Sequence, residues 1–239
     1  MVKVFLNEYE RRARLYPALI VLAPIIIFLY FIVPQVRENT FISIIIALGL
    51  IDLLAVVSRY IGKRKEKALF TLWGGPPTTR FLRHSDDNID PVTKKRYHEF
   101  LSESLPHSKI PTAKKELENP KFADIVYESS VRWLREKTRD IKCYPLVFRE
   151  NTTYGFCRNL WALKEISISL LSATSLLNSY LAYIKYRLDI FKINYDFWLI
   201  SLICLVLLLL WLFVIRKPFV QKAADGYARA LLAVCEGTA

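Results

Sequence analysis

The stretch FWLISLICLVLLLLWLFVI, residues 197–215, decides the class of fold. It contains no charged side chain and ends abruptly at Arg216, Lys217 and Pro218. A helix needs about 20 mostly apolar residues, at about 1.5 Å of rise each, to cross a hydrocarbon core of roughly 30 Å. Because this segment is apolar all round rather than along one face, it predicts a helix in lipid and not a helix in a water-soluble core.

Three further apolar segments extend this prediction: residues 18–33, 41–57 and 166–184. The last is the least apolar because it contains several serines, and a buried helix of a soluble core stays an alternative for it. Serine side chains also permit close approach and hydrogen bonds between helices in a bilayer, so we expect this span to face protein most. The sequence therefore predicts a mainly α protein with four transmembrane helices in two hairpins.

Basic residues define the expected orientation. Lysine and arginine cluster before the first apolar segment, after the second, before the third and after the fourth. Since cytoplasmic flanks carry such an excess, both termini and the middle of the chain are expected in the cytoplasm. The predicted parts are an N-terminal segment (1–17), hairpin 1 (18–58), a small helical cytoplasmic domain (59–164), hairpin 2 (165–215) and a C-terminal tail (216–239).

The sequence shows neither a cleaved leader nor a disulfide or zinc motif. Pro34 and Gln35 follow the first apolar run where a cleaved leader has small residues, so we expect this run to remain as an anchor. The four cysteines form no CxxC pair, which predicts reduced thiols and neither a disulfide framework nor a zinc site.

Helix-start signals organise the middle domain. Asp90-Pro91 and Asn119-Pro120 each pair a capping residue with proline at the first helical position. A short helix is expected over 112–118, and residues 60–72 are expected to continue the second span as a helix. The run YPLVF, residues 144–148, is strand-like.

The helix expected over residues 121–139 is the best of the domain. Its apolar side chains Phe122, Ile125, Val126 and Trp133 share one broad face, which predicts the side that packs.

A group of histidines and carboxylates is the densest polar cluster: His84, Asp86, Asp87, Asp90 and His98, of which Asp90 is already explained as a helix cap. Such side chains can bind a divalent metal, which keeps a metal-dependent enzyme open as an alternative. Their spacing matches no metal signature, and a solvated loop is the simpler interpretation. We therefore predict no catalytic residue, no metal and no cofactor, and a protein that is not an enzyme.

The net charge of +12 points instead to acidic or lipid partners. The cations expected to bind a partner or an anion are Arg80, Arg83, Lys94, Lys95 and Arg96. Lys63, Arg64 and Lys65 follow the second span, where anionic headgroups attract each cation by about 1 kcal/mol. The partner is expected to be a cytoplasmic protein or a nucleoprotein, and a plain basic surface facing acidic lipid stays an alternative.

Polar side chains inside the apolar segments are the membrane candidates. A carboxylate within a span is costly and usually faces protein or water. The expected polar seam between the hairpins consists of Asp52, Asn178, Ser172, Ser175 and Ser179. If several copies associate, this seam could become a leak.

Two stretches carry a resemblance: WGGPPTTRFLRH, residues 73–84, and TKKRYHEFL, residues 93–101. With two hairpins around a cytoplasmic domain, the chain resembles bacterial membrane effectors of anti-phage systems, including those carried by retrons. The resemblance is mainly architectural and transfers no catalytic residue. It implies a multi-pass protein of the bacterial inner membrane that damages the membrane when a partner releases it. A passive anchor or scaffold for a cytoplasmic complex is the alternative.

Overall fold

The computed structural model describes residues 7–105, 109–187 and 193–237. Within these ranges every regular element is a helix, which confirms the mainly α prediction. The chain forms two compact units, with residues 1–65 and 155–220 in unit 1 and residues 66–154 and 221–239 in unit 2. The C-terminal segment after residue 220 is thus part of the same unit as the middle of the chain.

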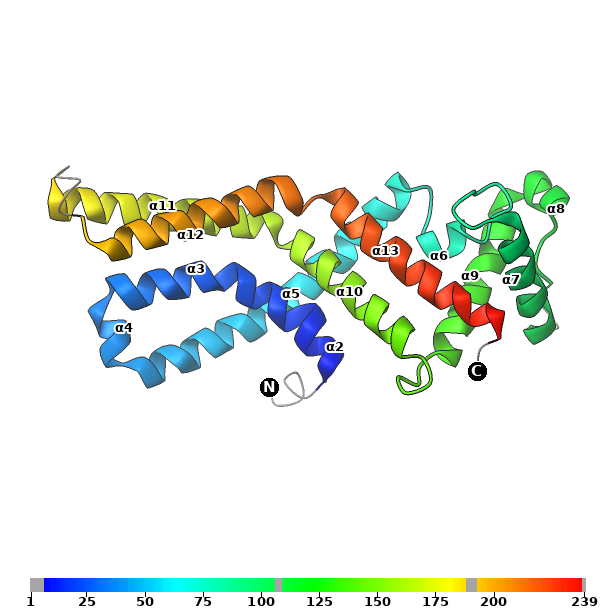
Figure 1. Cartoon of the computed structure of the whole chain (residues 1–239), viewed down its shortest axis with the longest axis horizontal. Coiled ribbons are helices and arrows are strands. Elements are labelled where there is room, and N and C mark those ends of the chain that lie inside the picture. The colour runs from blue at the N-terminus through cyan, green and yellow to red at the C-terminus, as the bar shows by residue number, and fades with distance from the viewer. Residues whose placement is uncertain (1–6, 106–108, 188–192, 238–239) are drawn as a thin grey trace. The chain divides into compact units, whose positions relative to one another are not determined.

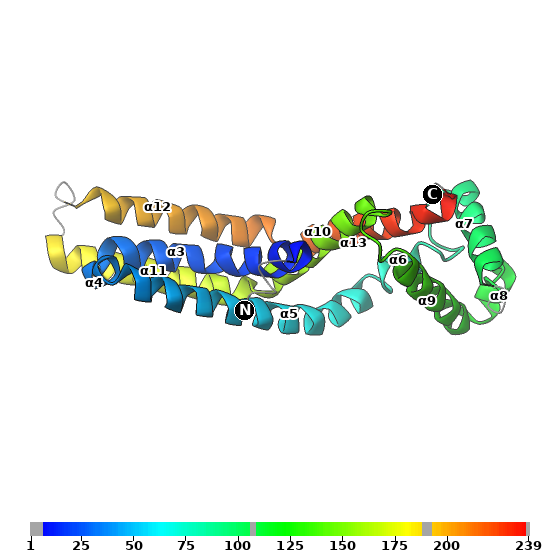
Figure 2. The ribbon, with the colours of Figure 1, turned by 90° about the horizontal axis from the view of Figure 1, so that it is seen from below.

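Unit 1 is built from long apolar helices. Two of them, α11 and α12, lie side by side, and α3 packs against both (Figures 1 and 2). The short helix α4 joins α3 to α5 (Figure 1). The elements that lie wholly or partly in this unit are α2 (Glu8–Glu10), η1 (Arg11–Leu15), α3 (Tyr16–Ile32), α4 (Pro34–Glu38), α5 (Thr40–Leu72), α10 (Pro145–Ala162), α11 (Lys164–Tyr186), α12 (Tyr195–Leu209), η3 (Leu210–Val214) and the start of α13 (Lys217–Leu232).

Several of these helices have the length and composition to cross a bilayer. Glu8–Ile32, Thr40–Arg80 and Tyr195–Val214 qualify on their own. Helices α10 and α11 qualify only together, across a bend of 53°. The described residues therefore contain three candidate spans, or four if the bent pair is one span, and they indicate a membrane protein. The segment 166–184, expected to be the weakest, is the one that needs its neighbour.

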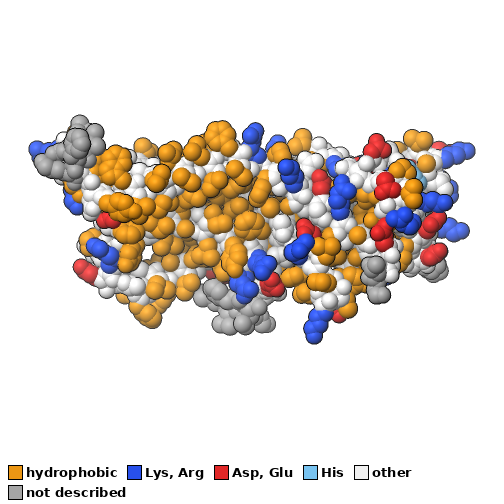
Figure 3. Space-filling view, viewed as in Figure 1, with side chains coloured by type: hydrophobic (Ala, Val, Ile, Leu, Met, Phe, Trp, Pro, Cys, Tyr) orange, Lys and Arg blue, Asp and Glu red, His pale blue; other side chains and the backbone are white. Residues whose placement is uncertain are grey.

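The core of unit 1 lies between α3, α11 and α12. Trp211 and Leu171 are each 1% exposed there, together with Val21 and Ile200. The outward side of the unit is apolar as well: Phe41 is 77% exposed. Figure 3 shows hydrophobic side chains covering the surface over α3, α11 and α12. Such exposure is expected where the surrounding solvent is lipid.

One polar contact ties the N-terminal helix to α10. Pro17 has no N–H with which to donate the usual helical hydrogen bond to the carbonyl of Ala13. The buried Asn159 donates to that carbonyl from Nδ2 at 2.7 Å instead. Gly62 of α5 also lies against Asn159, because a Cβ there would come within 2.7 Å of its Oδ1. The three segments therefore meet around one amide.

Unit 2 is a cluster of shorter helices: α6 (Pro77–Arg80), α7 (Pro91–Ser104), α8 (Ala113–Glu118), α9 (Pro120–Lys137), most of α13 (Lys217–Leu232) and η4 (Ala233–Glu236). Its predicted starts are confirmed. The Asp90 carboxylate accepts from the Thr93 N–H at 2.9 Å, and Asn119 Oδ1 accepts from the Phe122 N–H at 3.1 Å. The predicted continuation of the second span is confirmed too, since α5 ends at Leu72.

One local prediction is wrong and a second holds only in part. Residues 144–148 form no strand; Pro145 begins α10, in the position where proline suits a helix. A five-residue apolar run cannot by itself separate a strand from a buried helix. On α9 the predicted face is correct only in part: Val126 is buried with Ala123, Tyr127 and Leu134, whereas Phe122 and Ile125 are 59% and 63% exposed.

Candidate functional site

A pocket of about 490 Å³ in unit 2 is the candidate site. It lies between α7, the loop before it and the segment that leads into α8. Its polar lining residues are His84, Asp86, Asp87, Lys94, Lys95, His98, Glu99, Ser102, Glu103 and Thr112. The volume falls in the range of about 300–1,000 Å³ that is common for small-molecule sites. The structure thus gathers the predicted histidine–carboxylate cluster and two of the predicted docking cations around one cavity.

Glu116 of α8 does not line the pocket but anchors the loop that carries His84. It is 6% exposed and accepts four hydrogen bonds: from the N–H groups of His84 and Ser85 at 2.8 and 3.2 Å, from Ser85 Oγ at 3.0 Å, and from the hydroxyl of Tyr127 at 2.6 Å. Burial acts to raise the pKa of Glu116, but these donors outweigh it and lower the pKa below its usual value. The charged carboxylate therefore fixes the loop at residues 84–85 on α8 and α9.

The two histidines are held in one tautomer. His84 Nε2 lies 3.0 Å from the Pro111 carbonyl, and His98 Nε2 lies 2.8 Å from the Leu82 carbonyl. Because a carbonyl only accepts, each Nε2 carries a proton. The rings meet edge to face with centroids 4.7 Å apart. Burial lowers the pKa of His98 to about 4, so this imidazole is neutral at pH 7.

Lys94 is the buried cation of the pocket, at 5% exposed. Its ammonium group donates to the carbonyls of Arg83, at 2.7 Å, and Asp86. Burial lowers the pKa of Lys94, although the nearby Asp86 and Asp87 oppose the shift. A lysine with a lowered pKa in a concave site beside carboxylates is a recurrent mark of functional sites.

The remaining predicted docking cations do not line the pocket. Arg83 forms a two-pronged pair with Asp124, from Nε at 2.7 Å and from its terminal nitrogen at 2.9 Å. Arg80 lies 3.2 Å from Asp86 and 3.7 Å from Asp225.

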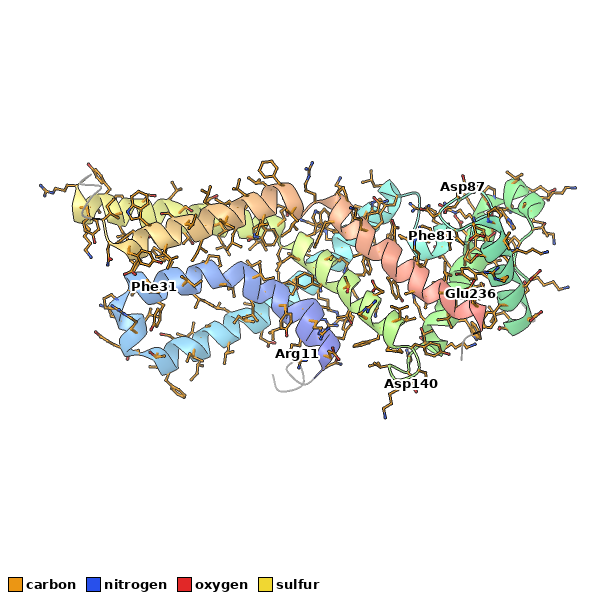
Figure 4. All side chains as sticks on the ribbon, in the orientation of Figure 1. Arg11, Phe31, Phe81, Asp87, Asp140 and Glu236 are labelled. Carbon is orange, nitrogen blue, oxygen red and sulfur yellow. The ribbon has the colours of Figure 1, made fainter. Side chains whose placement is uncertain are left out.

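Near the C-terminus of the described chain, Arg96 pairs with Glu236 of η4 at 2.6 Å, whereas Lys95 is 77% exposed (Figure 4 labels Glu236). The five cations thus do not form one free surface, and Arg80, Arg83 and Lys94 serve contacts inside unit 2.

The metal alternative gains no geometric support. His84, Asp86, Asp87 and His98 do line the same pocket. Over residues 7–105, 109–187 and 193–237, however, no three His, Cys, Asp or Glu side chains are grouped so that they could hold a metal ion.

The polar residues predicted to line a seam between the hairpins make their described contacts within one hairpin, between α11 and α12. Asn178, 1% exposed, donates from Nδ2 to the Phe197 carbonyl and to Ser201 Oγ, each at 3.0 Å. Ser175 lies within hydrogen-bonding contact of the Cys204 thiol, while Ser172 is half-buried and Ser179 exposed. Within the described residues the Asp52 side chain makes no hydrogen bond or ion pair, so no polar contact of this kind joins it to Asn178 or the serines.

The predicted headgroup-binding lysines and arginine also differ from one another. Lys63 and Arg64 are exposed. Lys65 is instead held within unit 1, where it pairs with Glu165 and lies 5.3 Å from the centre of the Trp161 ring.

Sequence reasoning missed Glu116 and Tyr127, because the stretch AKKELE reads as an exposed charged helix. The chain matches no protein-family model, no curated protein and no solved structure.

Proposed function

We propose that this chain is a non-enzymatic effector of the bacterial inner membrane, in which unit 1 perturbs the bilayer and unit 2 receives a controlling cytoplasmic partner. Both termini lie in the cytoplasm in this proposal, as the basic flanks of the apolar segments favour. The resemblance to retron-type anti-phage effectors supports the same assignment.

The observation that carries the proposal is the joint presence of apolar helices of membrane-spanning length and a preformed polar pocket in one chain. A passive anchor needs only a surface to which its cargo attaches. Here Glu116, with four hydrogen bonds, and the buried Lys94 stabilise a concave site whose rim residues Asp87 and Lys95 are exposed. The charged side chains at this rim can complement opposite charges on a docked partner.

Expression of the full chain without its partner tests the function. A dye that reports membrane potential should show depolarisation within the time of induction, while an equal amount of an unrelated membrane protein leaves the potential intact. Normal potential and growth at high expression of the full chain would refute the effector function and leave the anchor.

Charge reversal at the pocket tests the control step. Lys95→Glu places an anion at the rim, whereas Lys121→Glu makes the same charge change at an exposed position of α9 that does not line the pocket. In the native host, where the partner is present, Lys95→Glu should release depolarisation and Lys121→Glu should not. Equal behaviour of the two variants would remove the pocket from the proposal.

A further inference from the structure

A second cavity, of about 190 Å³, lies in unit 1 between the facing ends of α11 and α12. Asn178, Ser179 and Tyr183 line it from α11, and Phe197, Trp198 and Ser201 line it from α12. The proposed function does not use this cavity. A ligand site here requires only that the α11–α12 pair lies in a bilayer.

The amide of Asn178 leaves one atom unsatisfied at this cavity. Both N–H groups of Nδ2 are used, by the Phe197 carbonyl and by Ser201 Oγ. The Oδ1 atom is buried and has no hydrogen-bond partner among the described residues. A buried acceptor without a donor is costly, and most so where no water competes. An N–H or O–H donor that entered the cavity and reached Oδ1 would satisfy this acceptor.

The lining also favours a positive charge. Tyr183, Phe197 and Trp198 are aromatic, and ring faces attract ammonium groups. The chain's own Lys185 already uses this surface: its Nζ lies 5.9 Å from the centre of the Phe197 ring. A donor that carries positive charge, such as a primary ammonium, satisfies both the Asn178 acceptor and the rings.

The surroundings place this cavity at the level of lipid headgroups. The exposed side chains Tyr180, Tyr183, Tyr195 and Trp198 form an aromatic belt of the kind found at membrane–water boundaries. Lys185 follows Asn178 by seven residues, two helical turns or about 10 Å along the same face of α11. Its ammonium group is a partner for a phosphate above the cavity.

We infer that this cavity binds the headgroup of phosphatidylethanolamine, with its primary ammonium donating to Asn178 Oδ1 against the aromatic rings and its phosphate on Lys185. Phosphatidylcholine has the same phosphate and charge, but its trimethylated nitrogen has no N–H. The site should therefore separate the two lipids, although both are zwitterionic.

Lipid binding to the purified full chain tests the inference. Native mass spectrometry of the chain with equal amounts of the two lipids should show roughly tenfold or greater preference for phosphatidylethanolamine, as expected for a hydrogen bond between a charged donor and a buried acceptor. Asn178→Leu should abolish the preference. The matched control Thr174→Val, at a buried polar residue of α11 that does not line the cavity, should keep it.

Further arms keep the test decisive. If Asn178→Leu does not insert, Asn178→Asp retains the acceptor and should strengthen the preference. Lys185→Gln should weaken binding of both lipids and leave their ratio unchanged. Soluble glycerophosphoethanolamine should not displace the lipid; if it does, the ligand is a soluble amine and the lipid assignment falls. Equal binding of the two lipids, or a preference that survives Asn178→Leu, overturns the site.

Discussion

Replacing Glu116 by alanine should destabilise unit 2 more than any exposed charge in it. The substitution leaves the hydroxyl of Tyr127, a residue that is 0% exposed, without its hydrogen-bond acceptor. It also removes the acceptor of the His84 and Ser85 N–H groups. Water can reach the exposed His84 and Ser85 backbone, but not the hydroxyl. An unpaired buried donor costs about 1–3 kcal/mol, and hydrogen bonds to a charged group are worth about 1.5–3 kcal/mol each. We expect a loss of about 2–4 kcal/mol.

Amide hydrogen exchange of the chain in nanodiscs measures this loss where it occurs. The amides of α7, α8 and the loop between Leu82 and Asn88 should exchange faster, while those of α3 and α12 stay unchanged. Tyr127→Phe removes the stranded hydroxyl, so the double variant should lose at least about 1 kcal/mol less than the two single losses together. A loss under 1 kcal/mol for Glu116→Ala, or strict additivity, would refute the role given to this carboxylate.

Three other perturbations test separate contacts. Acidification should destabilise unit 2, because the pKa of His98 is about 4 in the folded chain against a reference value of 6.5, so the unfolded chain takes up the proton first. The free energy of unfolding should fall by up to about 3 kcal/mol as the pH falls from 6.5 to 4. The His98→Gln variant should lack this part of the pH dependence. Arg83→Lys keeps the charge but loses the two-pronged pair with Asp124, so denaturation should show a loss of about 1–2 kcal/mol, and an unchanged midpoint would contradict the pair. Gly62→Ala should lower the thermal stability of unit 1, because the new Cβ would lie 2.7 Å from Asn159 Oδ1; wild-type stability would show that the amide moves freely.

Local signals in the sequence were enough for much of the fold. Apolar length identified the candidate spans, and the caps at Asp90 and Asn119 identified the starts of α7 and α9, because each signal is complete within a few residues. The packed side of α9 could be predicted only in part in this way, since Val126 is buried but Phe122 is not. Tyr127 is buried by its bond to Glu116, so a polar contact between two helices overrides the apolar pattern that put Phe122 inside.

The candidate site could also be predicted only where its residues are close together in the sequence. His84, Asp86, Asp87 and His98 are close in sequence, and they do line one pocket. Whether each cation is free or paired could not be predicted, because Arg83 and Arg96 form ion pairs with Asp124 and Glu236, which are distant in sequence. Positive charge in a sequence thus does not separate a free surface from an internal ion pair.

Positions 17 and 159 depend on each other, although they are far apart in the sequence. Pro17 cannot donate a hydrogen bond to the Ala13 carbonyl, and Asn159 donates to it instead. With Pro17 in place, the amide at 159 is needed; with Pro17→Ala, the backbone can supply its own N–H and the amide becomes spare. Natural variation at the two sites should therefore be correlated, with asparagine lost most readily in chains that lack the proline. An engineer who wishes to replace Asn159 by an apolar residue should change residue 17 first.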